Sequence, residues 1–337
     1  MCFANINIQA QSTNPVGAIP GAIDVSPMGA ATYTIPIEVV PGTQGMQPNL
    51  SIVYNSFEGM GLLGMKWNLE GLSAISRCGQ NPYYERQNPL FESNITAIQF
   101  NERDRFEIDG ERLIRLNNGT YGAVGGEYAT EMEDFTRIVS YSGTIHPKDI
   151  SEEGDIFPDR VINQPKYFIA YTDDGTTIEY GNTNDSKQMM KDSENILSWY
   201  INKITDIDGN YMTFHYIKYD SSEVLINSIQ YTGNSGLQPY AKVQFNYTNL
   251  PDTLGANTYF VEGYSVAQTK LLESILVKYN NEIVRKYKCE YNFHYGERTA
   301  HLQRVILFGY DENGNEEQLN ETSISWGEQN TDINQEL

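Results

Sequence analysis

The amino-acid sequence predicts an all-β chain of antiparallel, hairpin-rich, twisted sheets, and three observations support this fold class. Large apolar residues occupy every second position in many short segments, which is the pattern of strands with one buried face. Five Asp-Gly or Asn-Gly dipeptides lie between such segments, and these pairs favour tight hairpin turns. No segment shows the length and period of a long amphipathic helix.

Residues 1–28 have no regular pattern and are rich in Gly, Pro, Asn and Ser, so we expect an extended leader segment there. The first residues, MCFANINIQAQS, are similar to the tail of a signal peptide whose basic start and apolar core are missing. This similarity favours a protein that is secreted or displayed at the cell surface. An ordinary frayed terminus is the alternative.

The next stretch begins with two predicted strands. Large apolar side chains occupy every second position from Tyr33 to Val39, and again over residues 50–54. Pro36 has no amide hydrogen to donate, so the first strand is expected at a sheet edge or beside a bulge. Pro41-Gly42 predicts the turn between the two strands.

A glycine-rich segment follows these strands. Gly59, Gly61 and Gly64 are interspersed with large apolar residues and lead to Trp67. Glycine at this density predicts backbone at positive φ, folded tightly beneath a buried indole. The whole stretch 29–78 contains no nucleophile, base or metal-ligand cluster, so its predicted role is architectural.

The rest of the chain predicts further hairpins. We expect a first β subdomain at 29–145, an acidic loop or junction at 146–164, a β-hairpin subdomain at 165–327 and a tail at 328–337. Polar residues 182–197 predict a mobile loop or one short helix. Hairpin turns are predicted at Asp109-Gly110, Asn118-Gly119, Asp174-Gly175, Asp208-Gly209, Asn280-Asn281 and Asn313-Gly314.

Composition excludes several classes of partner. Acidic residues outnumber basic ones by 44 to 23, which gives a formal net charge of −21 and a surface that repels nucleic acid and anionic membrane. No apolar run approaches the roughly 20 residues that a membrane-spanning helix needs. Three widely spaced cysteines match neither a disulfide framework nor a zinc pattern, and Cys289 is expected to be a buried structural thiol.

The sequence offers no catalytic set of residues. Glu131 and Glu133 are similar to the E-x-E pair of ADP-ribosyltransferases, but the S-T-S strand of that family is absent. His215 lies between two aromatic residues in a predicted strand, so it is expected on a sheet face. The other histidines lack partners at a recognisable spacing: His146, His294 and His301. We therefore expect no catalytic residue, no metal site and no cofactor.

Two of the predicted turns share the pattern D-x-[D/N]-G-N, at 206–210 and 311–315. Their carboxylates are potential calcium ligands, but an EF-hand loop needs Gly at its sixth position and Glu at its twelfth. Counted from Asp206, these positions hold Tyr211 and Ile217. Hairpin-turn chemistry explains the pattern without a metal, and a weak Ca²⁺ site on this acidic surface is the alternative.

Residues 29–78 match a known family at many fixed positions, and weaker matches extend over about residues 15–327. The matched positions include Gly29, Tyr33, Pro36, Pro41, Gly42, Tyr54, Asn55, Ser56, Gly61, Gly64, Trp67, Gly71, Leu72, Ser73 and Arg77. Further elements of the same pattern start at Asp104 and Asp109, and Ser325-Trp326-Gly327 resembles the end of such domains. The chain thereby resembles the N-terminal domain shared by the Salmonella plasmid virulence protein B (SpvB) family, the B components of insecticidal toxin complexes and related Rhs/YD-repeat proteins.

This resemblance implies a Rhs/toxin-complex shell-like fold and a non-catalytic role as part of a β-sheet wall that houses or presents a toxin. The implied partners are the remaining Rhs/YD-repeat or toxin segments of the same chain or of a partner chain. It also favours a fragment of a larger virulence protein. The alternative is an extracellular module that binds glycan or protein through exposed tyrosines, and an enzyme in its own right is a third hypothesis.

Overall fold

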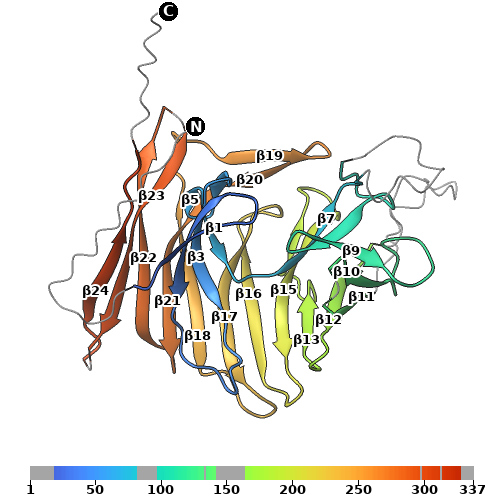
Figure 1. The fold of residues 1–337 in the computed structure, drawn as a ribbon, viewed down its shortest axis with the longest axis horizontal. Coiled ribbons are helices and arrows are strands. Elements are labelled where there is room, and N and C mark those ends of the chain that lie inside the picture. Colours follow the sequence, from blue (N-terminus) through green and yellow to red (C-terminus); the bar gives the residue numbers. More distant parts are fainter. Residues whose placement is uncertain are drawn as a thin grey trace, which may run out of the picture.

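The computed structural model describes residues 19–81, 97–132, 134–141, 164–296, 298–311 and 313–327 (Figure 1). Within these ranges the strands of every sheet are antiparallel and no helix is present, so the predicted fold class is confirmed. The same ranges accordingly include no helix of the length and apolarity required to cross a membrane. Most of the predicted leader and junction, and the whole predicted tail, lie outside the described residues.

Four strands from the first part of the chain form a small sheet in the order β1-β2-β3-β6. Buried residues occupy every second position of β2, as the period of two predicts. Two short strands, β4 and β5, pair with each other in the connection between β3 and β6. The bounds are β1 Ala22–Val25, β2 Ala31–Ile37, β3 Leu50–Asn55, β4 Met60–Gly61, β5 Gly64–Met65 and β6 Trp67–Glu70.

The prediction that Pro36 lies in an edge strand or beside a bulge is wrong, because β2 lies between β1 and β3 in a regular register. The partner register explains how the proline is accommodated. β1 pairs only with residues 31–34 of β2, so Pro36 lies beyond the end of β1 and has a strand partner, Ser51, on one side. The missing amide hydrogen therefore removes no ladder bond to β1.

Eight strands form a closed ring in the order β7-β8-β9-β10-β11-β12-β13-β15. The ring closes because β15 pairs with β7 through its first half and with β13 through its second half. The bounds are β7 Ala74–Cys78, β8 Arg105–Ile108, β9 Glu111–Arg115, β10 Glu127–Thr130, β11 Arg137–Tyr141, β12 Tyr167–Tyr171, β13 Thr177–Tyr180 and β15 Ile196–Thr205.

Strand β15 also starts an open sheet, β15-β16-β17-β18-β21-β22-β23-β24. A short strand, β14, pairs with β15, so residues 182–197 contain a strand rather than the predicted loop or helix. Strands β19 and β20 form a separate hairpin. The bounds are β14 Lys187–Met189, β16 Tyr211–Lys218, β17 Val224–Gly233, β18 Ala241–Asn249, β19 Asn257–Val261, β20 Tyr264–Gln268, β21 Lys270–Tyr279, β22 Glu282–His294, β23 Thr299–Tyr310 and β24 Glu316–Ser323.

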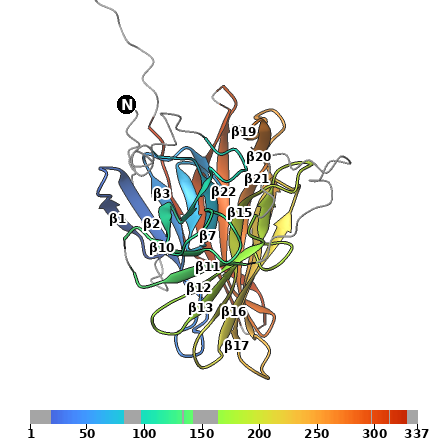
Figure 2. The ribbon, with the colours of Figure 1, turned by 90° about the vertical axis from the view of Figure 1, so that its right-hand side faces the viewer.

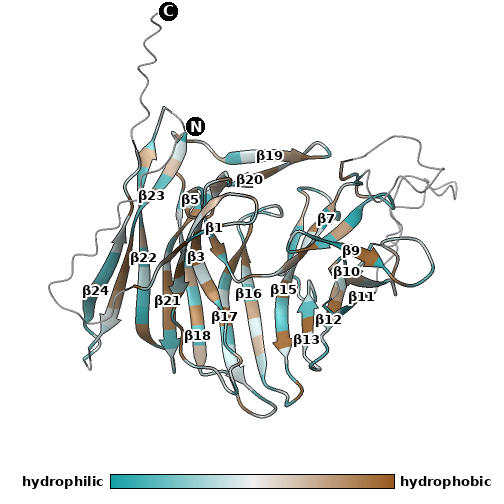
Figure 3. Cartoon of the chain, viewed as in Figure 1, coloured by the Kyte–Doolittle hydropathy of each residue, from teal (hydrophilic) through white to brown (hydrophobic). Residues whose placement is uncertain are grey.

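One hydrophobic core joins the small sheet, the ring and the open sheet. Figures 1 and 2 show the small sheet lying over one face of the open sheet. Figure 3 shows both hydrophobic (brown) and hydrophilic (teal) residues along the strands. Two tyrosines of the open sheet also bind the connection that follows β2. The hydroxyl of Tyr231 donates to Val40 O (2.9 Å), and the hydroxyl of Tyr287 accepts from Glu38 N–H (3.0 Å).

The interior of the ring is filled by aromatic side chains. Phe106, Tyr128, Phe168 and Trp199 are all almost completely buried, and their ring centroids lie 5.1–6.3 Å apart in edge-to-face contacts. The indole Nε1 of Trp199 donates to Pro165 O (3.2 Å), which satisfies its one donor. The closed ring of eight strands therefore has an interior filled by packed side chains.

Five of the six predicted hairpin turns are present, and they are of two kinds. At Asp109-Gly110 and Asn280-Asn281 both residues have positive φ, as a two-residue hairpin turn requires. At Asp174-Gly175, Asp208-Gly209 and Asn313-Gly314 only the glycine has positive φ, and the turn spans five residues. Asn118-Gly119 instead lies in a longer connection between β9 and β10.

Candidate functional site

The residues of the 29–78 motif gather where the small sheet, the ring and the open sheet meet. Trp67 is 1% exposed, which confirms the predicted burial of its indole. Its ring packs against Tyr54 at 5.5 Å and against Tyr33 at 6.3 Å between centroids. The glycine-rich segment contacts Trp67 through the backbone, because Leu63 N–H donates to Trp67 O (3.2 Å).

Two glycines of the motif allow backbone segments to approach each other closely. Gly64 has a φ of +90°, and a Cβ there would lie 2.4 Å from Ala300 O in β23. Gly71 has a φ of +99°, and a Cβ there would lie 1.9 Å from Asn49 O. The prediction of positive φ at Gly59 and Gly61 is wrong. Glycine at position 61 has a different reason, because a Cβ there would lie 2.4 Å from Trp67 O.

Several other motif residues stabilise turns of the small sheet. The hydroxyl of Ser56 accepts from Ala31 N–H (2.9 Å), and Oδ1 of Asn55 accepts from Phe57 N–H (3.0 Å). Gly29 lies in the turn between β1 and β2. The remaining turn residues, Pro41 and Gly42, lie in the connection between β2 and β3.

Leu72 and Ser73 connect the small sheet to the ring. Leu72 packs, half-buried, against the shared core. The hydroxyl of Ser73 donates to Asp109 Oδ2 (2.6 Å) and lies 3.0 Å from the hydroxyl of Tyr180. Because Asp109 Oδ1 also accepts from Ala74 N–H (2.9 Å), the start of β7 is bound to the β8–β9 turn.

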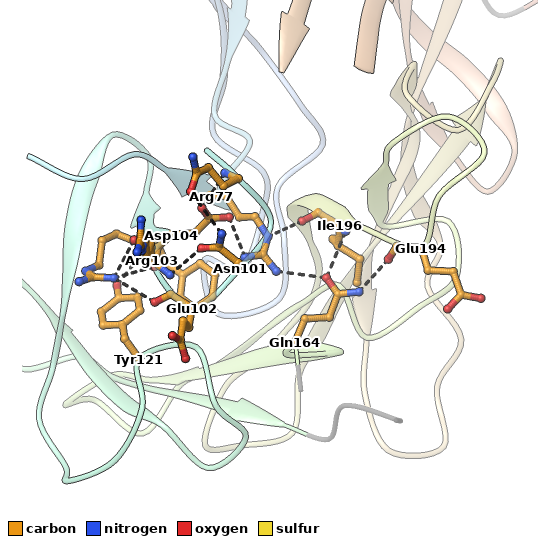
Figure 4. A network of polar contacts seen from close by, with 12 residues as sticks. Arg77, Asn101, Glu102, Arg103, Asp104, Tyr121, Gln164, Glu194 and Ile196 are labelled. Carbon is orange, nitrogen blue, oxygen red and sulfur yellow. Dashed lines mark hydrogen bonds and ion pairs between the residues drawn. The ribbon is translucent and has the colours of Figure 1, made fainter. Parts of the chain in front are cut away.

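Arg77 is the most highly connected polar residue of the motif, and Figure 4 shows its surroundings. Its guanidinium donates to Ile196 O (2.8 Å), to Asp104 Oδ2 (3.1 Å) and to Gln164 Oε1 (3.1 Å). The same guanidinium lies 5.6 Å from the ring centroids of Phe106 and Trp199. The side chains of Arg77 and Asp104 are 2% and 1% exposed, so this ion pair is fully buried in the ring.

Burial shifts the ionisation of both partners in this pair. It lowers the pKa of the Arg77 guanidinium and raises the pKa of the Asp104 carboxyl, and their mutual attraction opposes both shifts. Asp104 Oδ1 additionally accepts from Gln99 N–H (2.8 Å). With these partners the buried charges are compensated, which is the condition for keeping an ion pair inside a protein.

A cavity of about 570 Å³ lies beside residues 60–74 of the motif. Its lining brings together the motif, strands β14, β15, β16 and β17, and the β19–β20 hairpin. The lining side chains include Leu62, Leu69, Leu72, Gln188, Tyr200, Tyr216, Glu223, Ile226, Tyr259, Val266 and Gln268. Glu223 is the one ionisable carboxylate of this lining. Its oxygens accept from Thr269 N–H (2.6 Å), from the Thr269 hydroxyl (2.6 Å) and from Lys270 N–H (3.2 Å), so they bind the start of β21.

The described part of the chain contains no catalytic constellation around this cavity. Burial raises the pKa of Tyr200 and Tyr216, so both hydroxyls stay protonated at neutral pH. His215 is exposed on β16 beside the hydroxyl of Thr213 (3.3 Å), which confirms its position on a sheet face. Burial raises the pKa of Cys289 to about 12, as expected of a structural thiol.

The other residues weighed for chemistry are also placed. The rings of His294 and His301 lie 4.3 Å apart on the β22–β23 hairpin, and His301 packs on Trp326 at 4.4 Å. His146 and Glu133 lie outside the described residues. Across the ranges that the structure describes, no group of three His, Cys, Asp or Glu side chains is arranged to hold a metal ion.

The carboxylates of the two D-x-[D/N]-G-N turns are used inside the turns. Asp206 Oδ1 accepts from Asp208 N–H (2.9 Å) and Asn210 N–H (2.8 Å), and Oδ2 accepts from the Asn210 amide (2.8 Å). Asp311 makes the same three bonds, to Asn313 and Asn315. Hairpin-turn chemistry therefore accounts for this pattern.

Comparison with known proteins identifies the family. The model of the SpvB family, described as Salmonella virulence plasmid 65kDa B protein, matches residues 25–330. The chain belongs to this family. No curated protein sequence matches the chain.

Solved structures show the same fold. The structure of TcdB2-TccC3 aligns with a TM-score of 0.68 at 13% identity and covers 96% of this chain. A Photorhabdus luminescens Tc holotoxin pore gives a TM-score of 0.64 at 14% identity over 96% of the chain, or 16% of the matched one. The N-terminal domain of the effector SpvB from Salmonella typhimurium gives 0.58 at 14% identity, covering 82% of this chain and 100% of that one. This chain spans only 17% of the TcdB2-TccC3 chain.

The sequence identified the motif but not all of its partners. Asp104 starts one of the family elements in the sequence, and that match is the available signal for the partner of Arg77. Gln164 lies 87 positions from Arg77 and carries no signal of its own. The cavity was not predicted either, because its lining comes from segments that are far apart in the sequence.

Proposed function

We propose that this chain is a non-catalytic structural module of a secreted, toxin-complex-like virulence protein, forming part of a β-sheet shell that houses or presents a toxin. One observation carries the proposal: residues of the family motif join the sheets to one another and form hydrogen bonds with backbone groups of the turns. Arg77, the most highly connected polar residue of the motif, is fully buried, and each of its three guanidinium nitrogens donates to a protein partner.

The partners we propose are the remaining YD-repeat or toxin segments of the same chain or of a partner chain. The open sheet offers one place for them. Strand β24 is the last strand in the order of this sheet, and among the described residues only β23 pairs with it. An unpaired strand edge is a template for a further strand, so a following segment could extend the wall there.

Export and the division into subdomains 29–145 and 165–327 remain parts of this proposal. The support for export is the signal-like start of the sequence and the kinship with a virulence-protein family. The division into two subdomains rests on the sequence pattern alone, because one closed ring takes β7 to β11 from the first stretch and β12, β13 and β15 from the second.

The experiment compares amide hydrogen exchange in this chain alone and together with the proposed partner segments. The outward amides of β24 are expected to exchange rapidly in the isolated chain and slowly with those segments present. Amides of the β11–β12 pair serve as an internal control and should not change. Equal exchange of β24 in both samples would contradict a continuing wall, and ADP-ribosyl transfer or proteolysis by the purified chain would contradict a non-catalytic role.

One cluster favours the second candidate function, binding of glycan or protein by tyrosines. Tyr141 and Tyr167 are half-buried on β11 and β12, and their rings stack at 5.1 Å. The hydroxyls of Tyr141 and Tyr171 lie 2.8 Å apart, and Arg137 lies 5.2 Å from the Tyr171 ring. Glycan-array binding that is lost in Tyr167→Ala/Tyr171→Ala would support this function, and no binding by the wild type would exclude it.

A further inference from the structure

One face of the open sheet carries basic and amide side chains in rows that cross the strands. Direct cross-strand partners present their side chains on the same face of an antiparallel sheet. The first row, from β15 to β21, is Lys203, Thr213, Gln230, Lys242 and Lys278. The second row, from β16 to β22, is His215, Ser228, Gln244, Leu276 and Lys286. We call these two rows the basic face.

The basic face contains no carboxylate, although acidic residues outnumber basic ones by 44 to 23 in the chain. The carboxylates begin at its flank. Lys286 donates to Glu316 of β24 (2.7 Å), and Lys288, outside the two rows, donates to Glu290 (2.9 Å). The lysines at the flank, Lys286 and Lys288, are therefore paired with carboxylates, whereas the lysines at the centre of the basic face are not, among the residues that the structure describes.

The centre of the basic face holds two lysines in direct opposition. Lys242 of β18 and Lys278 of β21 are cross-strand partners, and like charges at such positions destabilise a sheet. Lys278 Nζ donates to Gln244 Oε1 (2.8 Å), which is a neutral acceptor. Within the ranges described, neither lysine forms an ion pair with a carboxylate. Burial and the charge of Lys242 lower the pKa of Lys278.

We propose that the basic face docks an acidic polypeptide segment, with a carboxylate placed between Lys242 and Lys278. Charge complementarity carries this assignment, because a carboxylate there would replace a repulsion between two ammonium groups by two attractions. The side-chain amides of Gln230 and Gln244 border the same position and are suited to hydrogen bonding with a polypeptide.

A short segment fits this face better than an extended polyanion does. Charges act over about 8 Å at physiological ionic strength, so a ligand confined to the two rows avoids most of the acidic surface around them. A nucleic acid or an anionic membrane would extend over that acidic surface, which repels it.

Binding is tested with a fluorescent peptide of repeated Glu-Ser units, by anisotropy at about 25 mM and about 300 mM salt. We expect saturable binding that weakens at the higher salt concentration. The variant Lys242→Gln/Lys278→Gln is expected to bind about five- to tenfold more weakly. Absence of binding to the wild type would overturn the proposal.

A matched control separates the basic face from net charge. Lys166→Gln/Lys191→Gln removes the same two charges elsewhere and is expected to leave peptide affinity within about twofold. Equal weakening in both double variants would overturn the proposal, because binding would then follow net charge alone. Equal binding of a single-stranded oligonucleotide would overturn the assignment to a polypeptide.

A second variant tests the cost of the opposed lysines. Lys278→Glu places opposite charges at the cross-strand pair, so we expect a higher thermal midpoint for the free chain together with loss of peptide binding. This outcome cannot arise from misfolding. A lower midpoint would contradict the repulsion on which the proposal depends.

Discussion

At the scale of single residues, the 29–78 motif consists of contacts that only particular side chains, or the absence of one, can make. Trp67 packs between two tyrosines, and Gly64 lets the β4–β5 hairpin lie against Ala300 of β23. Arg77 bridges the start of β15, Asp104 and Gln164 inside the ring. A buried arginine beside a carboxylate could suggest an active site, but here each of the three guanidinium nitrogens donates to a structural partner.

The buried ion pair gives the first prediction. Arg77→Met should destabilise the chain by about 3–5 kcal/mol, because it leaves the Asp104 carboxylate buried without its partner. Chemical denaturation measures the loss. The double variant Arg77→Met/Asp104→Asn should recover part of it. Arg137→Met, which removes an exposed ion pair with Glu127, should cost less than about 1 kcal/mol. Similar losses for the two arginines would contradict the structural role of Arg77.

The close approach at Gly64 gives the second prediction. Gly64→Val should destabilise by about 1–3 kcal/mol or more, because a Cβ would combine strain at positive φ with a clash against Ala300 O. Gly59→Val is the matched control, since Gly59 lacks positive φ and a Cβ there meets nothing within 4 Å. Thermal unfolding distinguishes the two. Equal midpoints for both variants would refute this account of the glycine-rich segment.

At the scale of elements, turn chemistry and strand pairing determine most of the hairpins. The sequence predicted where the turns lie, because Asp-Gly and Asn-Gly pairs tolerate positive φ. It did not predict that three of them are five-residue turns, in which an Asp or Thr at the first position interacts with the residues that follow it. That difference depends on side-chain hydrogen bonds, such as those made by Asp206 and Asp311.

These turns give the third prediction, which concerns calcium. Addition of Ca²⁺ or of EDTA should leave the thermal midpoint unchanged, because Asp206 and Asp311 already accept three N–H donors each. Asp206→Ala should lower the midpoint by the loss of these bonds, equally with and without Ca²⁺. A midpoint that rises with Ca²⁺ in the wild type and not in the variant would establish the weak site instead.

A row of ion pairs across β22, β23 and β24 gives the fourth prediction. The hydrogen bond from Lys288, assisted by Arg304, lowers the pKa of Glu290. A carboxyl with a depressed pKa stabilises the fold above its unfolded value of about 4.3, and the stabilisation is lost as pH falls through the folded pKa. Wild type should therefore be more stable than Glu290→Gln near pH 7, and the difference should shrink as the pH falls below about 4. Urea unfolding at several pH values measures this, and a constant difference would argue against it.

At the scale of the whole molecule, the sequence predicted strands but not how they close. Alternation and turn residues are local, so they identify β2, β3 and most hairpins of the second half. The ring depends on β7 pairing with β15, and on Arg77 reaching Ile196 across 119 positions. Nothing local in the sequence encodes such a pairing. Likewise, the register that frees Pro36 from β1 depends on where β1 ends, which a proline alone does not reveal.

The shared strand β15 also has a consequence for synthesis. Ser76 in β7 and Ser198 in β15 have hydroxyls 2.8 Å apart in the folded chain but are separated by 122 positions. A ribosome adds about 5–20 residues per second, so β7 waits about 6–25 s for its partner to be made. During that interval one edge of β7 is available to other strands. Chaperones that act on nascent chains would therefore have most to protect between the synthesis of residues 78 and 196.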